Sequence, residues 1–197
     1  MEQNQELLDQ IRQKFALKQM PAHEYSPLVL AYIGDGIYDM VVRTIFVSRG
    51  NTQVDKLNKQ ASGVCRASSQ AAIAFAIAPL LTEAEASTYR RGRNARSFTK
   101  AKNATMSDYR HATGLEALCG YLYLNGETDR LLDLLLEGFV RTGILEFDGV
   151  QRNTGAEGEN TQAGTQIDIG TQTQADMEEC TESAIEKETV QQEQRKD

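Results

Sequence analysis

Apolar residues recur at helical spacing through most of the first 145 positions, and no stretch alternates apolar and polar residues long enough to predict a strand. The longest helical segment, Pro27–Ser48, is apolar on nearly every side, which is typical of a helix buried nearly all round. Ser26 is suited to cap it, and Pro27 fits the first helical position. We therefore predict an all-α fold organised around this helix.

The same periodicity predicts six further helices, separated by turn and capping residues. Thr82 and Glu85 match a capping box, in which each side chain satisfies the other residue's backbone N–H. Other expected N-caps are Thr52, Ser107 and Thr128, and Gly63 is the expected break between two helices. The predicted helices cover about 2–18, 53–62, 64–77, 83–93, 108–124 and 129–145.

The last stretch of the chain, 151–197, differs in composition from the rest. It has no proline, no aromatic residue and few aliphatic ones, so it is expected to be disordered because it buries too little apolar surface. It holds 4 basic and 11 acidic residues, 4 - 11 = -7, which is the net charge of the whole chain. Three parts are expected: an N-terminal helix and linker (1–25), a helical domain (26–148) and an acidic tail (149–197). The low pI therefore does not exclude a nucleic-acid-binding core.

The cysteines and the hydropathy of the chain indicate the cellular compartment in which the protein is expected. The three cysteines, Cys65, Cys119 and Cys180, are widely spaced and belong to no Cys/His motif, which argues against a disulfide framework or a zinc site. No apolar run is long enough to span a bilayer, and the polar N-terminus is unlike a signal peptide. A reducing cytoplasm is the expected location, with no membrane partner.

Two carboxylates stand out on predicted helices. Asp35 lies in the middle of the apolar segment, and Glu116 is the one charge in a row of small residues on the helix expected at 108–124. An ionised carboxylate in an apolar setting is costly unless it is paired, so a metal ion is a candidate partner. Two packed helices that each offer a carboxylate are able to share Mg²⁺, which prefers oxygen ligands. The alternative is that Asp35 sits at a wet edge of its helix.

A basic stretch precedes the Glu116 helix, with no acidic residue before Asp108. Polar residues and a glycine interrupt it, as in a phosphate-contacting segment. An ordinary solvated basic loop is the alternative. The candidate RNA-binding residues are Arg90, Arg91, Arg93, Asn94, Arg96, Lys100 and Lys102.

Four motifs together resemble one family: LAYIGD at 30–35, RGRNAR at 91–96, Tyr109-Arg110, and EALCGYLYL at 116–124. They closely resemble Mini-ribonuclease III, the bacterial branch of ribonuclease III that lacks the double-stranded-RNA-binding domain. The resemblance covers about 27–142 and excludes the acidic tail. It implies a ribonuclease III-like endonuclease domain at 26–148 that works as a homodimer.

The resemblance also implies an activity. The family cleaves double-stranded RNA with Mg²⁺, leaves 5′-phosphate and 3′-hydroxyl ends, and matures the ends of the large-subunit (23S) ribosomal RNA precursor. Asp35 and Glu116 match its catalytic, metal-binding acids, and the basic stretch matches the segment expected to engage RNA. Ribosomal proteins are candidate further partners.

Some positions depart from the wider family. Ala31 and Thr113 stand where full-length ribonuclease III enzymes carry further acids; the Mini branch shares both, so they leave only the number of metal ions open. Asp39 replaces a more usual glutamate, either as a group supporting the metal site or as a surface acid. The alternatives in other classes are an inactive RNA-binding module on the same fold and an unrelated all-α phosphohydrolase acting on nucleotides. The presence of Asp35 and Glu116 argues against the first, and the length of the basic stretch against the second.

The apolar character of Pro27–Ser48 also bears on assembly. It is apolar on more faces than one small domain can cover, which favours a homodimer. We expect Tyr32 and Tyr38 in the core or a dimer interface, Cys119 in the core, and His111 exposed at a helix start.

Overall fold

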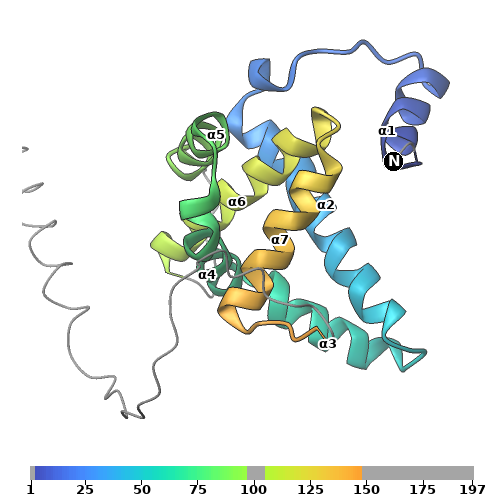
Figure 1. Ribbon diagram of the computed structural model, residues 1–197, viewed down its shortest axis with the longest axis vertical. Helices are drawn as coiled ribbons and strands as arrows, with labels where there is room; N and C mark the ends of the chain where they lie inside the picture. Colours follow the sequence, from blue (N-terminus) through green and yellow to red (C-terminus); the bar gives the residue numbers. More distant parts are fainter. Residues whose placement is uncertain (1–2, 97–104, 148–197) are drawn as a thin grey trace, which may run out of the picture. The chain divides into compact units, whose positions relative to one another are not determined.

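The computed structural model describes residues 3–96 and 105–147, and it confirms the all-α fold class (Figure 1). The predictions made for Lys100, Lys102 and the acidic tail lie outside these residues. Within the described ranges the chain contains no strand, and no helix is long and apolar enough to cross a membrane. The elements are α1 (Gln3–Lys14), η1 (Ala22–Glu24), α2 (Pro27–Ser48), α3 (Val54–Cys65), α4 (Ala67–Ile77), η2 (Ala78–Leu80), α5 (Glu83–Arg93), α6 (Met106–Leu124) and α7 (Thr128–Thr142).

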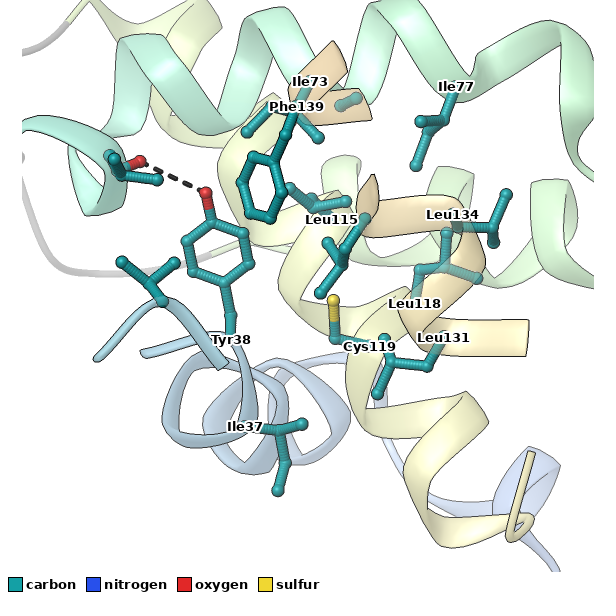
Figure 2. Close-up of a cluster of buried hydrophobic side chains, with 14 of the residues drawn as sticks. Ile37, Tyr38, Ile73, Ile77, Leu115, Leu118, Cys119, Leu131, Leu134 and Phe139 are labelled. Carbon is teal, nitrogen blue, oxygen red and sulfur yellow. Dashed lines mark hydrogen bonds between the residues drawn. The ribbon is translucent and has the colours of Figure 1, made fainter. Parts of the chain in front are cut away.

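Helix α6 is the centre of the packing. It contacts α2, α4, α5 and α7, and α7 in turn packs against α4 (Figure 1). The main hydrophobic core includes Tyr38 from α2, whose hydroxyl donates to the Val64 carbonyl at 3.2 Å (Figure 2). Cys119 and Leu118 of α6 lie in the same cluster as Leu131 of α7. The core positions expected for Tyr38 and Cys119 are confirmed.

Helix α2 begins and ends as predicted, but it is not buried all round. Ser26 caps it by accepting a hydrogen bond from the Val29 N–H, and Pro27 occupies the first helical position. The buried face comprises Leu30, Ala31, Gly34, Ile37, Tyr38, Val42 and Phe46. The opposite side leaves Val29, Tyr32, Met40 and Val47 exposed. The all-round burial is therefore absent from the single chain, because its neighbouring helices cover one side of α2 and leave the other apolar side open.

Two glycines bring α2 and α6 into close contact. A Cβ added at Gly34 would lie 1.7 Å from the Glu116 carbonyl oxygen, and one added at Gly120 would lie 2.1 Å from the Leu30 carbonyl oxygen. Both distances are far below van der Waals contact, so only a residue without a Cβ fits at either position. Gly92 of α5 likewise lies close to the Ala117 methyl and to the α6 backbone at Thr113 and Gly114. Helix α6 is thus held at backbone distance from both α2 and α5.

The boundary between α3 and α4 differs from the expectation at Gly63. Helix α3 continues to Cys65, and the break falls at Arg66, whose backbone is extended. Its guanidinium donates from Nε to Ser69 Oγ, and the Ser69 hydroxyl donates to the Gly63 carbonyl at 2.8 Å. Gly63 has open space around it, so it is tolerated within α3. The break comes from side-chain hydrogen bonds that satisfy the helix ends, which glycine placement did not indicate.

Three expected N-caps are off by one or two residues. The caps are Gln53, Thr105 and Glu127 in place of Thr52, Ser107 and Thr128. Only Thr105 among these three accepts a hydrogen bond with its side chain, from the Asp108 N–H. Local sequence offered several residues suited to capping at each position, and tertiary packing selected among them.

Some helix ends also differ. Helix α1 ends at Lys14, shortly before Ala16 adopts a positive φ of 49°. Helix α7 ends at Thr142 because Gly143 adopts the left-handed conformation with φ 65°, a common helix terminator.

The capping box at Thr82 and Glu85 is confirmed, and Glu85 has a further role that the sequence did not reveal. Its carboxylate is buried and accepts hydrogen bonds from Arg130 Nε at 2.8 Å and Nη2 at 2.9 Å. Arg130 Nη2 also donates to the Leu80 carbonyl at 2.7 Å. The Arg130 guanidinium is the main reason that the pKa of Glu85 lies below its usual value. This ion pair joins the start of α5 to α7.

The Gly34 contact yields a stability prediction with matched controls. We expect Gly34→Ala to destabilise the fold by about 3 kcal/mol, because the added methyl must push α2 and α6 apart at the backbone. Gly36→Ala on the same helix, and Gly63→Ala on α3, add a methyl to open space and should gain roughly 0.5–1 kcal/mol in helix propensity. Urea unfolding measures all three. Equal stability of Gly34→Ala and Gly36→Ala would contradict the close approach.

Candidate active site

The crossing of α2 and α6 brings Asp35 and Glu116 together. Gly34, directly before Asp35, lies against the backbone carbonyl of Glu116 itself. The negative charge of Asp35 raises the pKa of Glu116, which places the two carboxylates within electrostatic reach. The fold thus joins two acids that are 81 positions apart in the sequence, as 116 - 35 = 81.

The two carboxylates lie in different surroundings. Asp35 is exposed, so the alternative interpretation of a wet helix edge describes it better than deep burial does. Glu116 is partly buried, and this burial is the first cause that raises its pKa to about 7, ahead of the charge of Asp35. The pKa of Asp35 is also raised, by partial burial first and then by Asp39.

No ion pair within the described part of the chain involves Asp35 or Glu116. The ion pairs there join Arg12 to Asp9, Arg43 to Asp39, Arg130 to Glu85 and Arg141 to Glu137. Asp35 and Glu116 therefore repel each other without a compensating cation from these residues. This is the electrostatic arrangement expected of a pair that binds a positive ion.

Asp39 is one turn beyond Asp35 and is held in place. Arg43 donates to it from Nε, and the Cys65 thiol approaches its other oxygen at 3.6 Å. Arg43 also donates to Asn58 Oδ1. The burial of Cys65, together with Asp39, raises the pKa of the thiol to about 12, so this thiol stays protonated and unreactive at neutral pH. Asp39 acts on Asp35 through its charge.

The donor set fits a hard divalent cation. Across residues 3–96 and 105–147, no group of three or more His, Cys, Asp or Glu side chains is arranged to hold a metal. Mg²⁺ does not require such a cage, because it keeps several waters and is commonly held by one or two carboxylates together with substrate phosphate oxygens. Asp35 and Glu116 supply two oxygen donors and a local excess of negative charge.

The basic stretch divides into residues with different partners. Arg91 donates to the carbonyls of His23 and Tyr25, at 3.4 and 3.0 Å, and so ties α5 to the segment before α2. Arg93 donates from Nε to Asn94 Oδ1 at 3.1 Å. Arg90, Asn94 and Arg96 are exposed and Arg93 is partly exposed. The bonds of Arg91 to these backbone carbonyls stabilise the packing of α5 against the segment before α2.

Comparison with known proteins identifies the family. The Ribonuclease III domain profile matches residues 28–127. The Mini-ribonuclease 3 of Brevibacillus brevis is 42% identical over 114 residues, covering 58% of this chain and 85% of that protein. The Mini-ribonuclease 3 of Clostridium tetani is 44% identical over 120 residues, covering 60% and 76% respectively.

The chain belongs to the Mini-ribonuclease 3 family. A crystal structure of a Fusobacterium nucleatum protein is similar in fold, with a TM-score of 0.55 and 29% sequence identity, over 62% of this chain and 96% of that one. Membership of the Mini-ribonuclease 3 family makes the chain an endoribonuclease. The region that matches the family profile includes Asp35, Glu116 and the whole basic stretch.

In this Mini-ribonuclease 3 family member, His111 is not exposed as the sequence predicts. His111 is partly buried: its ring packs on Phe75, with centroids 4.3 Å apart, and its Nδ1 hydrogen-bonds with the Tyr89 hydroxyl. Burial, and then the charge of Arg93, lower the pKa of His111, so the neutral imidazole is favoured at pH 7. The sequence placed His111 near a helix start but carried no sign of its partners on α4 and α5.

The different surroundings of Asp35 and Glu116 predict a raised Glu116 pKa that can be measured. In the metal-free protein the Glu116 carboxyl should titrate at about pH 7, and Asp35→Asn should lower that pKa because it removes the second of the two causes that raise it. The side-chain ¹³C shift of Glu116, followed by NMR, reports it. Asp129→Asn, at the exposed start of α7, is the control and should leave the curve unchanged. A Glu116 pKa near the ordinary 4.3 in the wild type would refute the described site.

Proposed function

We propose that this chain cleaves double-stranded RNA in a Mg²⁺-dependent reaction, and that Asp35 and Glu116 hold the metal. The observation that carries the proposal is the pairing of these carboxylates across the α2–α6 contact, where each has a raised pKa. A natural substrate consistent with the resemblance is the 23S ribosomal RNA precursor, cut to leave 5′-phosphate and 3′-hydroxyl ends. Contacts with ribosomal proteins remain a prediction.

Different residues of the chain would bind the metal ion and the RNA. A bound Mg²⁺ would polarise the scissile phosphodiester and activate a water. Asp35 and Glu116, both deprotonated, would supply the negative oxygens that bind the cation, and Glu116 must first lose the proton that burial favours. Arg93 and Arg96 are proposed to neutralise RNA phosphates near the end of α5, as duplex RNA is recognised mainly by shape and backbone.

We also propose that the chain acts as a homodimer through the open side of α2. Three apolar side chains on this side are exposed: Tyr32 is 83% exposed, Met40 is 48% exposed and Val47 is 61% exposed. Met40 also lines an apolar groove of about 490 Å³ between α2 and α7. Exposed apolar surface of this kind usually marks an interface. A twofold pair would present one site to each strand of a duplex.

A cytoplasmic location is proposed with this function. The described cysteines, Cys65 and Cys119, are both free thiols, and Cys119 is fully buried in the core. Free thiols are consistent with a reducing compartment.

The central test replaces each acid by its amide. Asp35→Asn and Glu116→Gln should each abolish cleavage of a duplex RNA in Mg²⁺, because the amide has no negative charge for the cation. Both variants should keep the wild-type circular dichroism spectrum and bind the duplex within a few-fold of wild type. Asp129→Asn is the matched control and should cleave normally. Full activity in either amide variant would overturn the assignment, and no cleavage by the wild type with any divalent cation would favour the inactive RNA-binding module.

The arginines at the end of α5 are tested by their salt dependence. In a Glu116→Gln background, which prevents cleavage, Arg93→Ala with Arg96→Ala should weaken duplex binding. Each lost phosphate contact should also flatten the slope of log affinity against log salt concentration by roughly 0.9. Arg141→Ala on α7 removes an arginine that is paired with Glu137 and should change neither quantity. Fluorescence anisotropy across a salt series measures both, and an unchanged slope in the double variant would contradict the RNA contact.

The dimer prediction concerns Tyr32. We expect wild-type protein to sediment as a dimer and Tyr32→Ala to shift it toward monomer, because the variant removes the most exposed aromatic side chain from the open side of α2. Val54→Ala, at a residue 68% exposed at the start of α3, is the control and should leave the dimer intact. A monomeric wild type at micromolar concentration in analytical ultracentrifugation would refute the interface.

A further inference from the structure

A buried amide lies near the partly buried carboxylate of the site. Gln70, in the first turn of α4, is 2% exposed. Its Nε2 donates to the backbone carbonyl of Cys65 at 3.1 Å. Its Oε1 is fully buried and has no hydrogen-bond partner within the described residues. Glutamine is rarely found fully buried, and an unpaired buried acceptor is a cost that an apolar residue of the same size would avoid.

The Cys65 carbonyl fixes which way the amide points. Cys65 is the last residue of α3, so its carbonyl needs a partner from outside that helix. A carbonyl accepts only from the NH₂ end of the amide, which assigns Nε2 and Oε1 without ambiguity. Helix α4 packs against α6, and the side chain of Gln70 lies near enough to Glu116 to lower the pKa of that carboxyl, which favours its ionised form. One amide therefore connects the end of α3 to the carboxylate on α6.

The same end of α3 reaches the other acids. The thiol of Cys65 contacts Asp39, which adds negative charge beside Asp35. The backbone carbonyl of Cys65 accepts a hydrogen bond from Gln70, and Gln70 favours the ionised form of Glu116. The junction between α3 and α4 thus supports the carboxylate pair from both sides, although neither helix carries one of its acids.

We propose that Gln70 is a positioning residue for the metal site: its amide NH₂ fixes the Glu116 carboxylate for metal binding, and its free Oε1 accepts a hydrogen bond from a water that enters with the ion. The proposal rests on the assignment of Asp35 and Glu116 as the metal-binding pair. It explains why a polar side chain occupies a buried position where it leaves one acceptor unpaired. Gln70 acts through Glu116 and does not touch the RNA.

The experiment compares metal binding with cleavage in three variants. Gln70→Met keeps the length of the side chain and removes both hydrogen-bonding ends. Ser69→Ala is the matched control, because Ser69 is buried at the same junction but bonds to Gly63 and Arg66. Glu116→Gln is the reference for loss of the metal site. For each protein, the rise in melting temperature caused by Mg²⁺ without RNA is measured. For the wild type, Gln70→Met and Ser69→Ala, the Mg²⁺ concentration giving half-maximal cleavage and the KM for duplex RNA are measured as well.

Gln70→Met should raise the half-maximal Mg²⁺ concentration at least tenfold and largely remove the Mg²⁺-dependent rise in melting temperature. Its KM for RNA at saturating Mg²⁺ should stay within twofold of wild type. Ser69→Ala should lower the melting temperature and leave both metal readouts unchanged. If Gln70→Met does not fold, Gln70→Asn serves instead: it keeps the amide but is one methylene too short to span Cys65 and Glu116, and it should show the same weakening of metal binding.

The outcomes separate this inference from the proposed function. If Gln70→Met or Gln70→Asn folds and keeps the wild-type metal response while Glu116→Gln loses it, the role of Gln70 is refuted and the metal site stands. An equal change in Gln70→Met and Ser69→Ala would also refute it, since a general loss of packing would then explain both. If Glu116→Gln keeps the Mg²⁺-dependent rise in melting temperature, the assignment of the metal site itself is wrong.

Discussion

The absence of side chains at Gly34 and Gly120 sets the geometry of this molecule. Because neither residue has a Cβ, α2 and α6 meet backbone to backbone, with the Glu116 carbonyl lying where a methyl on Gly34 would be. Asp35 and Glu116 are brought together by that contact. The same helix α6 approaches α5 at Gly92, which carries the arginines of its last turn to the vicinity of α6. Close helix packing is therefore what places the proposed metal-binding and RNA-binding groups on one framework.

Much of the fold and the candidate pair followed from the sequence because those signals are local. Helical periodicity marked α2, α5 and α6, and both Ser26 and the Thr82–Glu85 box cap helices where the sequence predicts. The four motifs were specific enough to indicate the family, which the comparisons confirm. Several N-caps and the break at Arg66 were misplaced because several nearby residues had suitable chemistry and packing chose among them.

The features that the sequence did not reveal all depend on contacts between distant residues. The sequence groups Arg91 with the candidate RNA-binding arginines but gives no sign that its guanidinium donates to the carbonyls of His23 and Tyr25. The Arg130–Glu85 pair, the Phe75–His111–Tyr89 contacts and the burial of Gln70 each join separate helices. The sequence also did not determine which of Asp35 and Glu116 would be the more buried, since both lie on helices with apolar neighbours. Periodicity gives the face of a helix but not how deeply its neighbours cover it.

The difference in burial between the two acids has a consequence for how pH and metal act together. At Glu116 a proton and a cation compete for the same oxygens, and burial favours the proton up to about pH 7. Below that pH the site must release a proton to bind metal, so apparent metal affinity falls as pH falls; above it the carboxylate is already ionised and the dependence levels off. Asp35, more exposed to water, is desolvated less than its partner, although partial burial raises its pKa too. The negative charge of Asp35 nevertheless raises the affinity of Glu116 for both the proton and the metal ion. A divalent ion is attracted more strongly than a proton by two carboxylates, because it carries two charges and can bind oxygens of both. The partly buried Glu116 thus makes the site pH-sensitive, and the exposed Asp35 biases it toward the metal.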